Sequence, residues 1–152
     1  MNIQSIDVTL IQFFRKYFLP MARFGLFVIF FWFGILKVLG LSPAGALVES
    51  LFHQTIHFMS FPTFYLSLGL FEMLIGILFL IKGAERVVLP LLLFHMVSTI
   101  MPLFLLRDPT WTSFMVPTME GQYIIKNLVV IACAMGIASH LHPLSASKKV
   151  EI

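Results

Sequence analysis

Four long apolar stretches limit what this chain can fold into. They cover residues 24–41, 61–81, 87–106 and 123–138 of the 152 residues. A helix needs about 20 apolar residues to cross the hydrocarbon core of a bilayer, which is about 30 Å thick. Because backbone N–H and C=O groups in lipid must find partners within the protein, helices are the spanning form that such stretches favour. The pattern therefore predicts four transmembrane helices.

The composition points the same way. Hydrophobic residues make up 59% of the chain and charged residues 11%, and the mean hydropathy is +0.98. Soluble domains contain about 25% charged residues. The short connections between the stretches favour antiparallel neighbours and leave no room for a soluble module. We therefore predict an all-α fold, an integral membrane antiparallel four-helix bundle over residues 21–140, with spans near 22–41, 61–81, 86–106 and 121–139.

Basic residues near the span ends indicate the orientation. Seven lie on the side of the two termini, and only Arg107 lies on the other side. Because cytoplasmic loops carry the excess of Lys and Arg, we predict a multi-pass protein of the inner (cytoplasmic) cell membrane with both termini, including the tail 141–152, in the cytoplasm. The net charge of +3 then implies no nucleic-acid partner. Membrane lipids are the expected surroundings, and this basic rim could attract their anionic headgroups. The seven residues are Arg15, Lys16, Arg23, Lys82, Arg86, Lys148 and Lys149.

Residues 1–20 form a separate amphipathic segment in this interpretation. Apolar residues recur there at close to helical spacing, with charged residues between them. Such a pattern predicts an interfacial helix lying on the inner leaflet, and a frayed terminus is the alternative. A cleavable signal peptide is disfavoured, since the first apolar stretch is longer than a signal core of about 7 to 15 residues and carries Lys37.

Four ionisable residues within or at the edges of the spans are the candidate ligand-binding or proton-handling residues: Glu72, Lys126, Lys37 and His95. An acidic side chain at the bilayer centre costs at least about 2.5 kcal/mol, so it usually faces the protein interior and has a partner. With a rise of 1.5 Å per residue, Glu72 lies about 16 Å deep and the two lysines about 6 to 7.5 Å deep. Either lysine can reach Glu72 only by extending inward, and outward snorkelling is the alternative. For His95 the alternative is a core histidine bonded to a neighbouring helix.

The loop after the first span holds the only metal-ligand candidates. Glu49, His53 and His57 are spaced by four, so a helix over residues 44–58 would align them on one face. Two histidines and a carboxylate at this spacing could bind zinc or another divalent metal. Apolar residues fill the positions between them, however, and an amphipathic helix on the outer membrane surface explains the pattern without a metal. We therefore assign no metal site.

Redox chemistry by a pair of thiols within the chain is excluded by the cysteine count. Cys133 is the only cysteine, and it lies within the fourth span. A disulfide-exchange site within one chain needs two cysteines. Cys133 is therefore interpreted as a small packing residue.

Three segments resemble the conserved motifs of DoxX-like membrane proteins. Residues 31–37 (FWFGILK) resemble the signature that ends their first helix, residues 69–76 (GLFEMLIG) their second-helix segment, and residues 121–128 (GQYIIKNL) their fourth-helix segment. The resemblance covers about residues 20–140 and is nearest to the branch that includes reactive-chlorine-resistance proteins. It implies a four-helix membrane protein with Lys37, Glu72 and Lys126 as functional positions, linked to redox or oxidative-stress metabolism.

Three functions remain open at this stage. The chain could bind a quinone or similar apolar redox ligand between its helices, with Glu72 and His95 handling protons. It could instead be a non-catalytic subunit or assembly factor for a redox enzyme or another membrane protein, or form a homo-oligomer, with the charges setting helix register. A small proton-coupled carrier is the third reading, and no internal repeat supports it. Whether the chain is an enzyme stays open.

Overall fold

The computed structural model describes residues 3–143, which are mostly helical. Four helical segments are long and apolar enough to cross a membrane: α1 (Ile3–Val38), α3 (Phe61–Leu80), α4 (Glu85–Ile100) with its continuation α5 (Pro102–Leu105), and α7 (Met119–Ala138). Only 22–28% of the residues in their most apolar windows are buried, so most of each segment is left to contact lipid. Of the tail expected over residues 141–152, residues 144–152 lie outside the described part of the chain.

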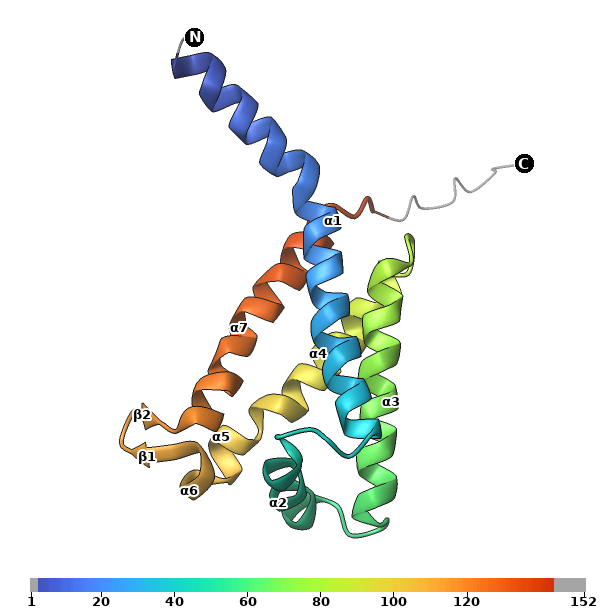
Figure 1. The fold of residues 1–152 in the computed structure, drawn as a ribbon, viewed down its shortest axis with the longest axis vertical. Coiled ribbons are helices and arrows are strands. Elements are labelled where there is room, and N and C mark those ends of the chain that lie inside the picture. The colour runs from blue at the N-terminus through green and yellow to red at the C-terminus, as the bar shows by residue number, and fades with distance from the viewer. Residues whose placement is uncertain (1–2, 144–152) are drawn as a thin grey trace, which may run out of the picture.

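Helices α1 and α3 lie side by side over most of the length of α3 (Figure 1). Glycines make this close approach possible. A Cβ added at Gly34 would lie 2.6 Å from the Gly69 carbonyl oxygen, and one added at Gly76 would lie 2.8 Å from the Phe31 amide nitrogen. Small residues at such crossings are the usual means of bringing membrane helices into backbone contact. Gly69 and Gly76, on either side of Glu72 in the sequence, therefore face the protein interior.

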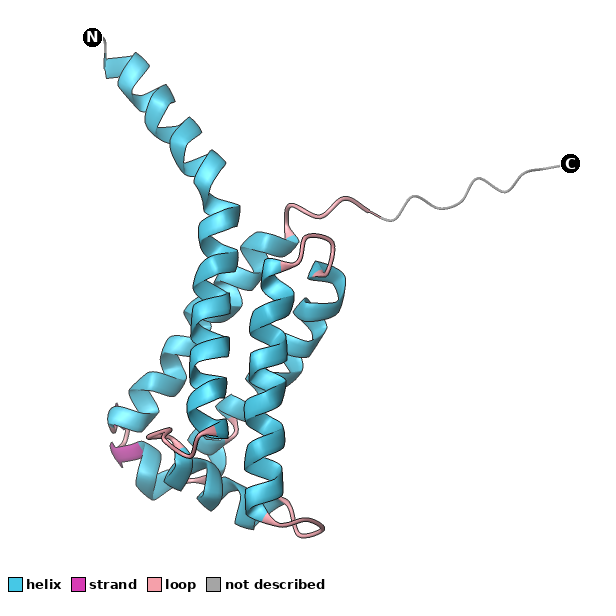
Figure 2. Cartoon of the chain, turned by 45° about the vertical axis from the view of Figure 1, so that its right-hand side comes forward, coloured by secondary structure: helices cyan, strands magenta, loops and turns pink. Residues whose placement is uncertain are grey.

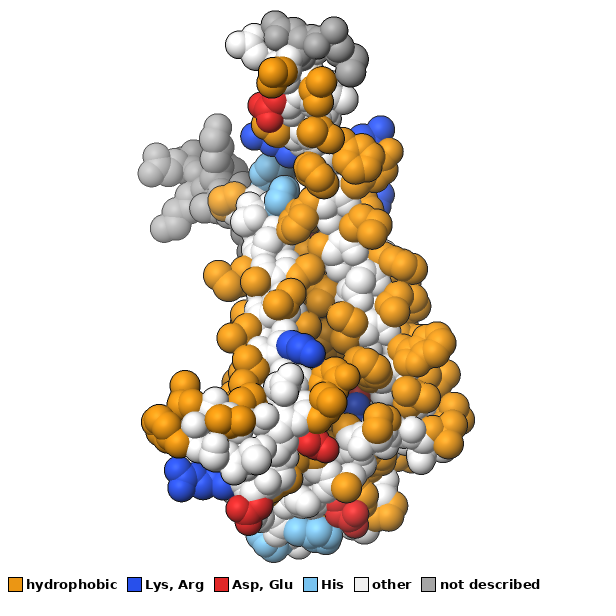
Figure 3. Space-filling view, turned by 60° about the vertical axis from the view of Figure 1, so that its left-hand side comes forward, with side chains coloured by type: hydrophobic (Ala, Val, Ile, Leu, Met, Phe, Trp, Pro, Cys, Tyr) orange, Lys and Arg blue, Asp and Glu red, His pale blue; other side chains and the backbone are white. Residues whose placement is uncertain are grey.

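The core lies where α1, α3, α4 and α7 meet. It contains side chains from all four helices, which matches the expectation that each helix buries one face and leaves the rest to lipid. The face of the helical body shown in Figure 3 is correspondingly apolar over much of its area, although Lys or Arg side chains also lie about halfway along it. The buried core residues are Ala22, Leu26, Phe30, Ile75, Phe79, Val88, Leu92, Met96, Ala134 and Ile137.

Helix α1 joins two segments that the sequence pattern separated. The amphipathic segment and the first span form one continuous helix of 36 residues, with Pro20 inside it. Proline removes one backbone donor and commonly bends a helix at this point. The N-terminal part of α1 leans away from the other helices (Figure 1). The first span ends at Val38, three residues earlier than expected.

Helix α2 (Gly45–Thr55) lies in the connection between α1 and α3. Its Phe52 is buried, with ring centroids 5.6 Å from Phe61 and 5.1 Å from Phe64, so α2 is anchored on the first turn of α3. The helix ends before His57, whereas the sequence interpretation carried it to residue 58. The alignment of three metal-ligand candidates on one helix face is therefore lost.

The connection between α4 and α7 contains a small β-hairpin, the feature that departs from the all-α expectation (Figure 2). After α6 (Arg107–Thr110), strands β1 (Trp111–Ser113) and β2 (Val116–Pro117) pair antiparallel. The Trp111 indole N–H donates to the Leu103 carbonyl at 2.9 Å, which ties the hairpin to α5. Pro102 marks the break between α4 and α5, since it cannot donate to the preceding turn.

Candidate functional site

Three of the four ionisable candidates meet in one buried cluster. The Lys37 ammonium donates to Glu72 Oε2 at 2.6 Å, and His95 Nε2 lies 3.2 Å from Glu72 Oε1. Lys37, Glu72 and His95 are 8%, 6% and 6% exposed. Each comes from a different helix, α1, α3 and α4 respectively. The carboxylate at mid-span depth therefore has partners on both of its oxygens.

The position of Gly69 explains how Lys37 reaches so deep. Lys37 lies in the last turn of α1, and a Cβ added at Gly69 would lie 3.0 Å from the Lys37 Cβ. The missing side chain at position 69 lets the lysine stem run along α3 toward Glu72, one turn further on. Lys37 thus extends toward Glu72 and does not snorkel to the nearer membrane surface. A paired charge at this depth avoids most of the cost of an isolated one.

His95 carries the one unsatisfied atom of the cluster. In its ionised form Glu72 can only accept, so the neighbouring His95 Nε2 is the donor, and in neutral imidazole Nδ1 then holds a free lone pair. Within residues 3–143, the buried His95 Nδ1 has no hydrogen-bond partner. The His95 ring makes edge contacts with Phe30 and Phe71, with centroids 5.6 and 6.0 Å away. Buried polar atoms are nearly always bonded, so this nitrogen is a candidate ligand contact.

Lys126 does not join the cluster. It is exposed on α7, and its ammonium lies 4.7 Å from the centroid of the Tyr123 ring, a cation–π arrangement. Among the described residues, none of the ion pairs involves Lys126. Of the two lysines at similar depth, Lys37 is the one that pairs with Glu72.

A second, partly buried ion pair is one that the sequence pattern does not predict. Arg23 of α1 pairs with Glu85, the first residue of α4, and Glu85 is 7% exposed. The sequence pattern predicts for Arg23 only a place among the charges that set the orientation. The available signal was that Glu85 stands alone among the basic residues Lys82 and Arg86, at the membrane end where Arg23 also lies. This pair joins α1 to α4 at the end opposite the Lys37 cluster.

The metal-ligand candidates of the first loop remain apart from the cluster. His53 Nε2 lies 3.8 Å from Glu49 Oε1, both residues are exposed, and His57 lies beyond the end of α2. In the part of the chain that the structure describes, no three His, Cys, Asp or Glu side chains are grouped to hold a metal ion.

Comparison of the chain with protein-family profiles, curated protein sequences and solved structures found no match. The chemistry must therefore be judged from the cluster itself. The charges of Lys37 and Glu72 cancel, so the cluster with neutral His95 carries no net charge. Protonation of His95 Nδ1 would add an uncompensated charge at membrane depth. A ligand hydroxyl that donates to Nδ1 would satisfy this atom without adding charge.

Proposed function

We propose that this chain is a DoxX-like protein of the inner membrane that binds a quinone-type redox ligand, in its hydroquinone form, beside the Lys37, Glu72 and His95 cluster. The four long helices form an antiparallel bundle, and both termini lie in the cytoplasm. The protein is linked to redox or oxidative-stress metabolism through this ligand.

The unpartnered His95 Nδ1 is the observation that carries the proposal. A hydroquinone hydroxyl is a donor, and Nδ1 is an acceptor held in fixed orientation by the Glu72 contact at Nε2. The edges of Phe30 and Phe71 beside the imidazole offer apolar contacts to an aromatic ring. Lys37 has two further N–H donors beyond the one that Glu72 accepts, and these suit a carbonyl or phenolate oxygen.

The test is His95→Gln in gently purified full-length protein. Glutamine keeps an N–H donor in place of Nε2, but its acceptor is the carbonyl oxygen of a flexible side chain and not a ring nitrogen held at the Nδ1 position. We expect binding of a short-chain benzoquinol to weaken by about tenfold, the upper range for one hydrogen bond. Native mass spectrometry with lipid extraction measures bound quinol, and His140→Gln, outside the cluster, is the matched control. Unchanged affinity in His95→Gln would refute the ligand site.

A non-catalytic subunit or assembly factor is the second candidate. The observation that favours it is that the cluster joins three helices and gives both carboxylate oxygens of Glu72 a partner without any ligand. In that case the charges set helix register, and the same mass spectra would show a second polypeptide and no quinone. Wild type and His95→Gln would then retain the partner equally.

A further inference from the structure

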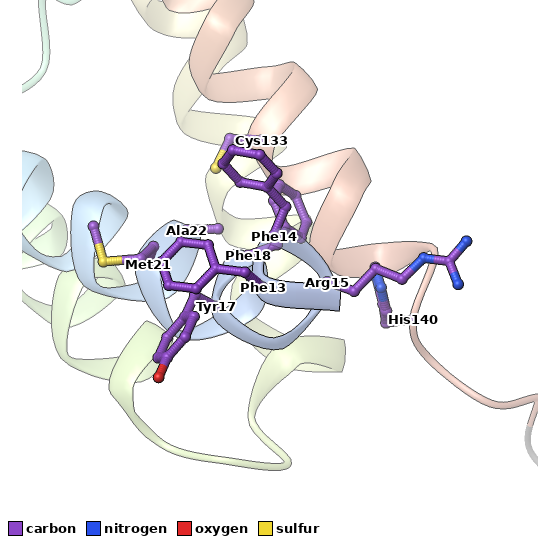
Figure 4. A pocket seen from close by; sticks show the side chains of 9 residues that line it. All are labelled: Phe13, Phe14, Arg15, Tyr17, Phe18, Met21, Ala22, Cys133 and His140. Atoms are coloured by element: carbon purple, nitrogen blue, oxygen red, sulfur yellow. The ribbon is translucent and has the colours of Figure 1, made fainter. Parts of the chain in front are cut away.

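An open groove lies at the other end of the molecule, between the N-terminal half of α1 and the end of α7 (Figure 4). Its volume is about 860 Å³. Phe18 forms the contact between the two helices, because a Cβ added at Gly136 would lie 2.7 Å from the Phe18 ring. The groove is lined by Phe13, Phe14, Arg15, Tyr17, Phe18, Met21, Ala22, Cys133 and His140.

The lining is divided into a cationic end and an apolar end. Figure 4 shows Arg15 and His140 together at one end of the group and Met21 at the opposite end. His140 Nδ1 lies 2.8 Å from the Gly136 carbonyl oxygen and donates to it, so in the imidazolium form Nε2 supplies a second N–H donor that suits a phosphate oxygen. Among residues 3–143, no carboxylate pairs with Arg15 or His140.

Membrane depth places the cationic end at the headgroups. Helix α1 has 36 residues, about 54 Å at 1.5 Å per residue, whereas the hydrocarbon core is about 30 Å thick. The twenty residues that cross the hydrocarbon core, counted from Val38 toward the N-terminus, end at Leu19. Arg15 then lies about 6 Å beyond the hydrocarbon, in the headgroup layer, while Met21 and Cys133 lie at the depth of the acyl chains.

The local charge is complementary to an anionic headgroup. Asp7 is the only acidic residue before Glu49 in the sequence. Lys16 adjoins Arg15, and its ammonium lies 5.5 Å from the centroid of the Tyr17 ring, on the same part of α1. Basic side chains at the cytoplasmic surface attract anionic lipids.

We propose that this groove binds one anionic phospholipid of the cytoplasmic leaflet, with the headgroup phosphate at Arg15 and His140 and an acyl chain along the apolar end. The site is independent of the Lys37, Glu72 and His95 cluster. The site gives the protein a preference for anionic lipids, which an apolar helix surface alone would not have.

The test compares phosphatidylglycerol with phosphatidylcholine of the same acyl chains, added to full-length protein in detergent and followed by native mass spectrometry. We expect phosphatidylglycerol to bind more tightly, and Arg15→Gln to weaken its binding by about fivefold, the effect of one basic residue near a headgroup. Lys82→Gln is the matched control, because Lys82 is an exposed basic residue near the same membrane face outside the groove. Equal binding of the two lipids would contradict the proposed site. An equal loss of phosphatidylglycerol binding in Arg15→Gln and Lys82→Gln would also contradict it, because basic residues anywhere on this membrane face would then attract the lipid equally.

Cys133 supplies a second readout, since it is the only cysteine of the sequence and lines the groove. Bound phosphatidylglycerol should slow maleimide labelling of Cys133 in wild type and in Lys82→Gln, but not in Arg15→Gln. If the protein is instead dimeric and Cys133 is protected whether or not lipid is added, a second copy of the chain occupies the groove and the lipid proposal fails.

Discussion

At the scale of single residues, the Lys37–Glu72 ion pair makes the sharpest prediction. Lys37→Met leaves the Glu72 carboxylate at mid-membrane depth with only His95 beside it. Breaking a buried pair by removing one partner typically costs about 3 to 5 kcal/mol, and we expect the low end of this range. The free energy of unfolding, measured by titrating detergent-solubilised protein with a denaturing detergent and following helicity, should fall by about 3 kcal/mol.

Lys126→Met makes the same substitution at the lysine outside the cluster. It removes only an exposed cation–π contact, which is worth about 0.5 to 1 kcal/mol. Glu72→Gln should restore much of the stability when combined with Lys37→Met, because no charge then remains unpaired. A loss in Lys126→Met as large as that in Lys37→Met would argue against the assigned pairing.

The sequence allowed the cluster to be anticipated only in part. The cost of burying charge singled out Glu72, His95 and the two lysines. Their depths differ by only about 1.5 Å, so depth could not decide which lysine pairs with Glu72. That choice depends on how α1 and α7 are rotated about their axes. Close packing at Gly34 and Gly69 turns Lys37 toward α3, whereas Lys126 faces outward beside Tyr123.

At the scale of helices, the contact between α1 and α3 depends on the absence of a side chain at position 69. In Gly69→Ala the new Cβ would lie 2.9 Å from the Gly34 carbonyl oxygen and 3.0 Å from the Lys37 Cβ. Overpacking of this kind costs about 1 to 3 kcal/mol, and here it also pushes Lys37 away from Glu72. We expect the same denaturation measurement to show a loss of about 2 kcal/mol.

Gly25→Ala is the control for that substitution. Gly25 also lies within α1, but a Cβ there meets nothing within 4 Å. Since alanine is a better helix former than glycine by about 0.5 to 1 kcal/mol, this variant should be as stable as wild type or more stable. Similar losses in the free energy of unfolding in Gly69→Ala and Gly25→Ala would contradict this prediction. The loss in Gly69→Ala could then not be assigned to the contact between α1 and α3.

The lengths of the apolar stretches predict where the spanning helices lie. Nothing in the sequence predicts the β-hairpin between α4 and α7. Strands of two or three residues are too short to show an alternating pattern. The turn lacks the Asn-Gly or Asp-Gly pair that signals a tight hairpin, and Met115 adopts a φ of 60°, a left-handed conformation that favours glycine. Tertiary bonds hold this segment instead, notably from Trp111 to Leu103 and from the Thr118 amide to the Thr110 carbonyl.

At the scale of the whole molecule, the ion-pair cluster and the groove lie toward opposite ends of α1. The cluster involves Lys37, at the C-terminal end, and the groove involves residues 13–22. In the proposed orientation, with both termini in the cytoplasm, the ligand site belongs to the outer half of the membrane and the lipid site to the inner leaflet. This separation means that variants at Arg15 should leave quinol binding unchanged, and variants at His95 should leave lipid preference unchanged.

That assignment of sides depends on the orientation of the whole chain, which single engineered cysteines can test. The end that holds the α3–α4 turn and the start of α1 carries Arg15, Lys16, Arg23, Lys82 and Arg86, whereas Arg107 is the only basic residue between the spans at the opposite end. Because basic loops are retained in the cytoplasm, in a Cys133→Ala background a cysteine replacing Asp108 should react with a membrane-impermeant maleimide on intact cells. One replacing Lys82 should react only after the membrane is opened. The reverse pattern would place the Lys37, Glu72 and His95 cluster near the cytoplasmic face, and the phospholipid groove would then have to draw its ligand from the outer leaflet.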